Sequence, residues 1–194
     1  MMGYAMSSTL ITQHYTAAEY LALERAAETK SELIGGEIVA MAGTSLTHAD
    51  IASNILFALR QCLKGKPCKV VAADIRVQID PQGTYVYPDV IVTCGKRLYG
   101  DSHLDTLLNP TVIFEILSPS TEARDRGEKW KAYQRLGSLQ DYLLVSQDQK
   151  RIEHYQRQGD LWVFTVYEGE GTEVSLASLG GNLPLAEVYE GIEG

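Results

Sequence analysis

The stretch VIFEILSPSTEARDRGEKWKAY, residues 112–133, decides the fold of this chain of 194 residues. It begins as an apolar run of β-branched and aromatic residues, which is typical of a buried strand. One carboxylate, Glu115, lies in the middle of that run. A carboxylate is costly to bury unless it is paired, hydrogen-bonded or bound to a metal ion. We therefore expect a partner for Glu115 elsewhere in the chain.

The second half of the stretch predicts a helix over residues 120–136. At about 100° of rotation per residue, its large apolar side chains share one face, which must be the buried one: Trp130, Tyr133 and Leu136. Lys129 lies in the middle of that face, whereas Lys131 points to the opposite side. One interpretation of Lys129 is a packed stem whose ammonium group reaches solvent. The other is a cation that lies beside Glu115.

A second carboxylate, Asp89, follows Pro88 inside a strand predicted over residues 85–93. Proline cannot donate to a sheet ladder, so Pro88 marks a bend that re-aims the next side chain. Two carboxylates on neighbouring strands can hold Mg²⁺, or Mn²⁺ in its place. The alternatives are a turn cap for Asp89 and a buried ion pair with a basic residue of the helix for Glu115.

The remaining sequence frames these elements. A capping-box pattern over residues 16–19 opens a short helix, and Gly35-Gly36 predicts a hairpin turn. We expect further elements as follows: a helix over 47–64, a strand over 69–79, a strand over 142–145, and short antiparallel strands over 151–156, 162–167 and 173–176. This order predicts an α/β (α+β) fold: a mixed central sheet flanked by helices, with an N-terminal helix-hairpin and a C-terminal antiparallel meander. Residues 12–194 are expected to form a single domain after a frayed tail at 1–11.

Composition limits the classes of function. The net charge of −8 argues against general DNA coating, which depends on excess Lys and Arg. Three cysteines without a CxxC pattern indicate neither a disulfide framework nor a zinc knuckle, and a reducing cytoplasm fits best. No apolar run approaches the roughly 20 residues that span a bilayer. We expect a cytoplasmic protein without a membrane segment.

Pro88-Asp89 and Glu115, in this order of elements, resemble the PD-(D/E)XK nuclease superfamily. More closely, the string over residues 115–121, followed by Asp125, Lys129 and Tyr133, resembles the Uma-type family of restriction endonuclease-like proteins. Other stretches resemble that family too: residues 32–38, His48, residues 74–77 and residues 141–145.

The resemblance implies a restriction endonuclease-like fold and Mg²⁺-dependent hydrolysis of DNA. Asp89 and Glu115 would be the metal ligands, and both would act in catalysis together with Lys129. The third position of the superfamily motif, usually lysine, is Leu117 here, and in the Uma-type family the following helix is thought to supply the missing lysine. Tyr133 would support Lys129 or contact the nucleic-acid backbone.

Three further residues carry two interpretations each. Glu32 either caps the hairpin or reaches the site, and His48 is either a hydrogen-bonded core histidine or a supporting group of the site. Asp74 either pairs with Arg76 or Lys69 or supplies a third carboxylate.

A homodimer is expected, because cutting both strands of a duplex usually takes two active sites. The main alternative is an inactive nuclease-fold module that binds nucleic acid or protein. A glycosidase is disfavoured, since two-carboxylate glycoside chemistry does not call for the inward lysine.

Overall fold

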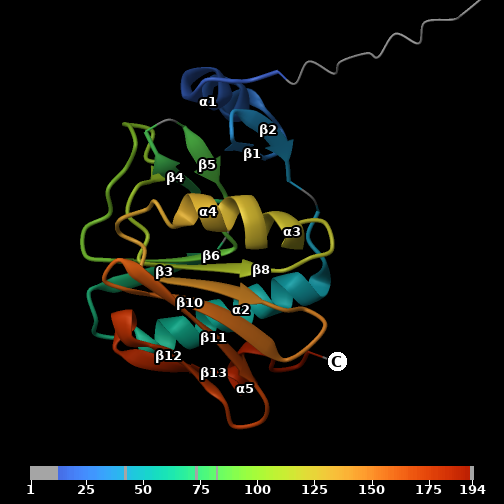
Figure 1. Ribbon diagram of the computed structural model, residues 1–194, viewed down its shortest axis with the longest axis vertical. Helices are drawn as coiled ribbons and strands as arrows, with labels where there is room; N and C mark the ends of the chain where they lie inside the picture. Colours follow the sequence, from blue (N-terminus) through green and yellow to red (C-terminus); the bar gives the residue numbers. More distant parts are fainter. Residues whose placement is uncertain (1–12, 42, 73, 82, 193–194) are drawn as a thin grey trace, which may run out of the picture.

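The computed structural model describes residues 13–41, 43–72, 74–81 and 83–192. The tail predicted over residues 1–11 lies outside the described residues. The fold is a mixed α+β arrangement, as expected, but its strands divide between two larger sheets rather than one (Figure 1). None of the described helices is both long and apolar enough to cross a bilayer.

The larger sheet has six strands in the order β11-β10-β9-β8-β6-β3. Its strands are β3 (Cys68–Ala72), β6 (Val90–Cys94), β8 (Val112–Ile116), β9 (Asp141–Val145), β10 (Arg151–Gln158) and β11 (Leu161–Glu168). β8 and β9 run parallel, and the other neighbours in this sheet are antiparallel. The sheet is therefore mixed, and the apolar run that contains Glu115 lies at its centre as β8.

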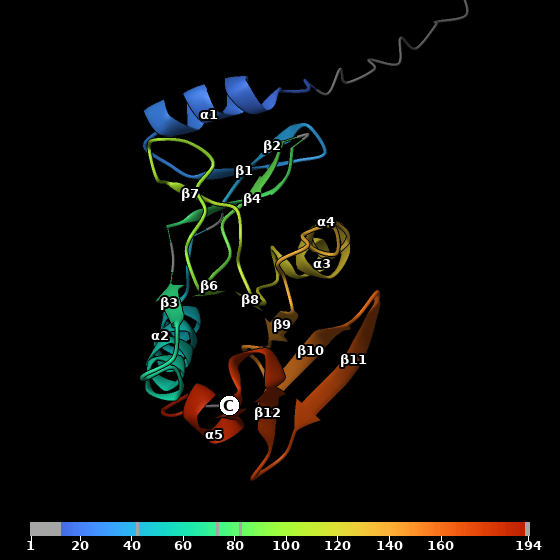
Figure 2. The same ribbon diagram turned by 90° about the vertical axis from the view of Figure 1, so that its left-hand side faces the viewer.

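The smaller sheet has five strands in the order β2-β1-β5-β4-β7. They are β1 (Ser31–Ile34), β2 (Glu37–Ala40), β4 (Arg76–Asp80), β5 (Thr84–Val86) and β7 (Thr106–Leu107). The predicted capping box is present at the start of helix α1 (Ala17–Ala26). Figure 2 shows α1 and the β1–β2 hairpin at the end of the molecule farthest from the C-terminal strands. The predicted helix-hairpin is thereby confirmed.

Two predicted strands are wrong in the same way. The strand expected over residues 69–79 is divided into β3 and β4, and the strand expected over 85–93 is divided into β5 and β6. Each pair of strands lies in different sheets, so each of these two predicted strands contains a crossing from one sheet to the other. Asp74 has a φ of 69° at the first crossing, and Pro88-Asp89 forms the second. The breaks are hard to detect in the sequence because apolar residues lie on both sides of each one, so each stretch resembles a single strand.

Two cores cover opposite faces of the six-stranded sheet. On one face lie helix α2 (Leu46–Cys62) and the C-terminal segment. On the other lie the smaller sheet and the helical segment 122–133, which contributes Ala132 and Tyr133. Side chains alternate along β8, so Phe114 enters the first core while Ile113 and Leu117 enter the second. Glu115 therefore shares the second face.

The predicted helix over 120–136 is not a regular α-helix. α3 (Glu122–Arg124) is followed by a π-helical turn, η1 (Asp125–Lys129), and then by α4 (Trp130–Tyr133). The predicted faces are nevertheless right, because Lys129 and Tyr133 are buried and Lys131 is exposed. Short π-helical turns are found frequently at functional sites.

The C-terminal part contains the expected β10–β11 hairpin. The next predicted strand, β12 (Glu173–Leu176), instead pairs with β13 (Gly181–Pro184) across the 3₁₀ turn η2 (Ala177–Leu179). A last short helix, α5 (Leu185–Val188), closes against α2.

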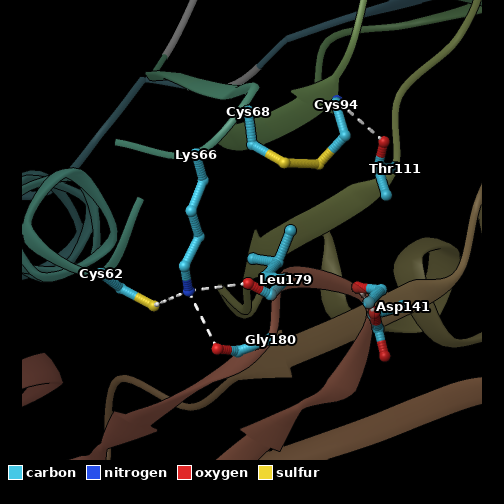
Figure 3. The surroundings of a disulfide bond; sticks show 9 residues. Cys62, Lys66, Cys68, Cys94, Thr111, Asp141, Leu179 and Gly180 are labelled. Carbon is cyan, nitrogen blue, oxygen red and sulfur yellow. Dashed lines mark hydrogen bonds between the residues drawn. A yellow bond between two sulfur atoms is a disulfide. The ribbon is translucent and has the colours of Figure 1, made fainter. Parts of the chain in front are cut away.

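The expectation of no disulfide is wrong. Cys68 of β3 and Cys94 of β6 are directly opposite in the antiparallel register and are joined by a disulfide (Figure 3). The count and spacing of cysteines cannot reveal this pairing, because it depends on which strands become neighbours. Cys62 is the free thiol, and nearby Lys66 donates from Nζ to the carbonyl oxygens of Leu179 and Gly180 at 2.9 Å each.

Candidate active site

Asp89 and Glu115 meet because β6 and β8 are antiparallel neighbours. Val90 pairs with Phe114, so the same register places Asp89, just before β6, across from Glu115. Oδ2 of Asp89 accepts a hydrogen bond from the backbone N–H of Ile116 at 2.6 Å. The bend at Pro88 thus places Asp89 within hydrogen-bonding distance of β8, the strand that carries Glu115.

Lys129 supplies the cation that Glu115 requires. Its Nζ lies 3.0 Å from Oε1 of Glu115, and both side chains are buried. Leu117 occupies the position two residues after Glu115 and points to the same face of β8. The helical segment packs on that face, so its lysine reaches Glu115 from above the strand instead of from within it.

Two more carboxylates surround the same ammonium group. Nζ of Lys129 is 3.0 Å from Oε1 of Glu32 and 3.3 Å from Oδ1 of Asp125. Glu32 comes from β1 in the smaller sheet, where its Oε1 also accepts the N–H of Tyr87 at 2.9 Å. The site therefore lies where the two sheets and the π-helical turn come together.

Tyr133 and His48 each hold one of the two central carboxylates. The hydroxyl of Tyr133 donates to Oε1 of Glu115 at 2.7 Å. Nε2 of His48, in the first turn of α2, lies 3.2 Å from Oδ2 of Asp89. Nδ1 of His48 is buried without a hydrogen-bond partner among the described residues.

Asp74 is not brought to this cluster. Its side chain is 76% exposed and forms an ion pair with Lys30. The left-handed backbone at Asp74 belongs to the crossing between β3 and β4, which explains why an acidic residue is found there. Asp125, in contrast, was not predicted as a site residue, although its spacing of four from Lys129 is a signal that sequence inspection could have used.

Burial controls the electrostatics of the cluster. Burial raises the pKa of Glu115 well above its usual range; Lys129 opposes this shift, and the nearby carboxylates of Asp125, Asp89 and Glu32 add to it. Burial alone would lower the pKa of Lys129, but the surrounding carboxylates outweigh it and hold that pKa well above its usual value. Burial also raises the pKa of Tyr133, which keeps its hydroxyl a donor. Lys129 is therefore protonated, and this one cation is surrounded by the carboxyl groups of Glu115, Glu32 and Asp125.

These side chains open into a cleft of about 640 Å³. Asp89, Glu115 and Lys129 line its floor together with Glu32, Asp125 and His48. Its walls include the Ser118–Thr121 turn and Arg124. The cleft gives the buried cluster a route to a ligand from solvent.

The donor set suits a hard cation. Both described hydrogen bonds to the carboxylate of Glu115 reach Oε1, and both contacts of Asp89 reach Oδ2. This leaves Oε2 and Oδ1 for another ligand, and two carboxylates with water suffice for Mg²⁺. Within the described residues, no three His, Cys, Asp or Glu side chains are placed to share one metal ion. Asp89 and Glu115 are therefore the two candidate ligands in this cluster.

The mixed sheet, the Pro-Asp crossing and the carboxylate pair with its lysine define a restriction endonuclease-like protein. A crystal structure described as a "putative nuclease" from Anabaena variabilis has the same fold, with a TM-score of 0.74 and 20% identity over 90% of this chain and 97% of that one.

The model of the Uma2 family, described as "Putative restriction endonuclease", matches residues 17–186, so this chain belongs to the Uma2 family. Two proteins of Synechocystis, both described as uncharacterized, are similar as well. One (sll1609) is 36% identical and covers 86% of this chain and 94% of its own length. The other (slr1290) is 35% identical and covers 90% of each.

Proposed function

We propose that this chain is a Mg²⁺-dependent endonuclease that hydrolyses phosphodiester bonds in DNA. The observation that supports this proposal most strongly is the convergence of Asp89, Glu115 and Lys129 at the floor of one cleft. Membership of a family described as "Putative restriction endonuclease" supports this reaction class. Mn²⁺ would serve in place of Mg²⁺.

In this proposal, Asp89 and Glu115 would hold the ion, with Oδ1 and Oε2 as the carboxylate oxygens that have no described hydrogen bond. The ion would supply Lewis acidity to the phosphate group. Tyr133 and His48 fix the two carboxylates, so that their geometry is set before substrate enters. Preorganised charges of this kind stabilise a transition state without the cost of reorienting solvent.

Lys129 would neutralise the negative charge that develops on the phosphate or position the attacking water. Its burial and its three carboxylate neighbours keep it protonated, so it acts as a fixed cation and not as a base. Arg124 on the cleft wall adds a cation that can meet the DNA backbone, although the whole chain carries a charge of −8.

The alternative is an inactive nuclease-fold module that binds nucleic acid or protein. One observation favours it: the ammonium group of Lys129 already pairs with Glu32, Glu115 and Asp125, so the cluster has a cation without a metal.

Cytoplasmic location remains a prediction, and the disulfide between Cys68 and Cys94 argues against a strongly reducing compartment.

Metal binding and cleavage can be measured separately. We expect Mn²⁺ to bind the wild-type protein in calorimetry or in electron paramagnetic resonance titrations, and Asp89→Asn and Glu115→Gln to abolish binding. Lys129→Met should keep metal binding and lose nicking of supercoiled plasmid. The matched control is Lys131→Met, which changes an exposed lysine two residues further along the chain. This variant should nick like the wild type. A wild-type protein that binds no divalent cation and nicks no DNA would establish the alternative.

A further inference from the structure

Strand β11 is a free edge of the six-stranded sheet. It is the outermost strand in the order β11-β10-β9-β8-β6-β3, and it pairs with β10 on one side over eight residues without a register shift. Figure 2 shows it at the outer margin of the molecule, away from the smaller sheet. An edge strand presents a row of backbone N–H and C=O groups that can pair with another strand.

The side chains of β11 leave apolar surface exposed on both faces of this edge. Leu161 is 72% exposed, Phe164 50% and Val163 39%. On the face toward the helical segment, Trp162 packs edge-on against Trp130, with ring centroids 5.0 Å apart. The strand is thus held firmly from one side while its outer margin meets solvent.

The other edges of the two larger sheets carry features that discourage pairing, and β11 carries none of them. β7 has two residues, β2 has four and begins with the exposed Glu37, and β3 carries the exposed Lys69 in its interior. Short strands and charged side chains, lysine above all, are the usual protection of an edge. β11 has eight residues, no proline, no bulge and no lysine, and Glu168 is its last residue.

We propose that β11 pairs antiparallel with β11 of a second copy of this chain, so that one sheet continues through both copies. Two copies that each carry −8 repel unless their contact is uncharged. The interior of β11 meets that condition, because pairing centred on Val163 or Thr165 places no like charges opposite each other within the strand. Glu168, the last residue of β11, is the one charged side chain of this strand, so a partner recognised by charge would have no other charged group in it to contact.

Antiparallel self-pairing also follows the pattern of the neighbouring strands. β9, β10 and β11 already run antiparallel in sequence, and a two-fold axis across the edge extends this alternation by one strand. A two-fold contact is closed, so it uses up both free edges and stops at a dimer. The β11 edge is separate from the cleft, so the dimer would form whether or not the protein is a nuclease.

The test is the molar mass in solution, measured by light scattering and sedimentation over about 1–200 µM without nucleic acid or metal. We expect the wild-type protein to be in a monomer–dimer equilibrium. Thr165→Lys places a cation in the middle of the edge without removing apolar core, and should weaken dimerisation at least tenfold. The control is Phe57→Lys, at a residue of α2 that is 67% exposed, and it should dimerise like the wild type.

Single cysteines test the contact directly. In a two-fold pairing one residue of β11 lies opposite its own copy, so we expect Val163→Cys, Phe164→Cys or Thr165→Cys to form a disulfide-linked dimer under mild oxidation. A cysteine at position 57 should not. The proposal is overturned if the wild-type protein stays monomeric throughout the range, or if Thr165→Lys dimerises as tightly as the wild type.

Discussion

Replacing Lys129 by methionine removes the cation from the most highly charged buried region of the described structure. The two side chains have similar length, so methionine retains the packing of the stem while the ammonium group is lost. Glu115, Glu32 and Asp125 then face one another with no counter-charge, and the Lys129 side chain being replaced is 6% exposed.

The expected loss of stability is large. Removing one partner of a buried ion pair costs about 3–5 kcal/mol, because it leaves an uncompensated buried charge. Packing adds little, since the exchange nearly conserves side-chain volume. We therefore expect the free energy of unfolding of Lys129→Met to be lower than that of the wild type by about 3–5 kcal/mol at pH 8.

The loss should depend on pH with a definite sign. Without Lys129, the folded-state pKa of Glu115 rises further above its unfolded value, because the group that lowers it is gone. A carboxyl with a raised folded-state pKa costs stability above its unfolded pKa, about 4.3, and the cost grows until the folded-state pKa is passed. The loss in free energy of unfolding of Lys129→Met, relative to the wild type, should therefore become smaller as pH falls from 8 to 5.

Urea denaturation followed by tryptophan fluorescence measures this free energy, because Trp130 belongs to the helical segment and Trp162 packs against it. The measurement is made in EDTA. Lys131→Met should change stability by less than about 0.5 kcal/mol, as exposed substitutions usually do. Adding Glu115→Gln to Lys129→Met should restore part of the loss. If Lys129→Met loses no more stability than Lys131→Met, the electrostatic account of the cluster is refuted.

Three further perturbations have definite expected outcomes. Replacing Cys68 and Cys94 by serine opens a loop with a sequence separation of 26 and should lower the free energy of unfolding by about 3.5 kcal/mol, measured against the wild type with and without reductant. Phe114→Ala, at a fully buried core position, should cost about 3–5 kcal/mol in the same assay, and a cost under 1 kcal/mol would contradict the packing described. Arg25 holds the pKa of Asp105 well below its usual range, so this pair stabilises the fold above about pH 4 and loses its effect as pH falls further. Because both side chains are partly exposed, Arg25→Ala should cost less than about 1 kcal/mol at pH 7 and less still near pH 2; a cost that does not fall with pH would refute the assignment.

The central strand and its partners could be predicted because the signals there are local. An apolar run that contains one carboxylate, and a helix with one inward lysine, make Lys129 a candidate partner for Glu115, beside the alternative of a packed stem whose ammonium group reaches solvent. The bend at Pro88 likewise follows from the missing N–H of proline. These rules act within a few residues, so the sequence displays them directly.

What could not be predicted depends on contacts between distant segments. Apolar residues lie on both sides of Asp74 and of Pro88-Asp89, so each stretch resembles one strand with a bend, and periodicity gives no sign that residues 69–79 and 85–93 are divided between two sheets. The disulfide requires that β3 and β6 be neighbours. Glu32 could be proposed for the site but not assigned, because its place there depends on how the smaller sheet docks onto the larger one.

The π-helical turn over Asp125–Lys129 has a consequence for anyone who aligns relatives of this chain. Such a turn holds one residue more than a regular helix of the same span, so the residues on either side of it point in the directions that a regular helix one residue shorter would give them. Gly127 has open space around its α-carbon, so the turn does not need glycine there. Deleting Gly127 should therefore yield a regular helix in which Lys129 still faces the strand that carries Glu115. A relative with a one-residue gap in this turn should be read as keeping the lysine, even where its K is aligned one position away.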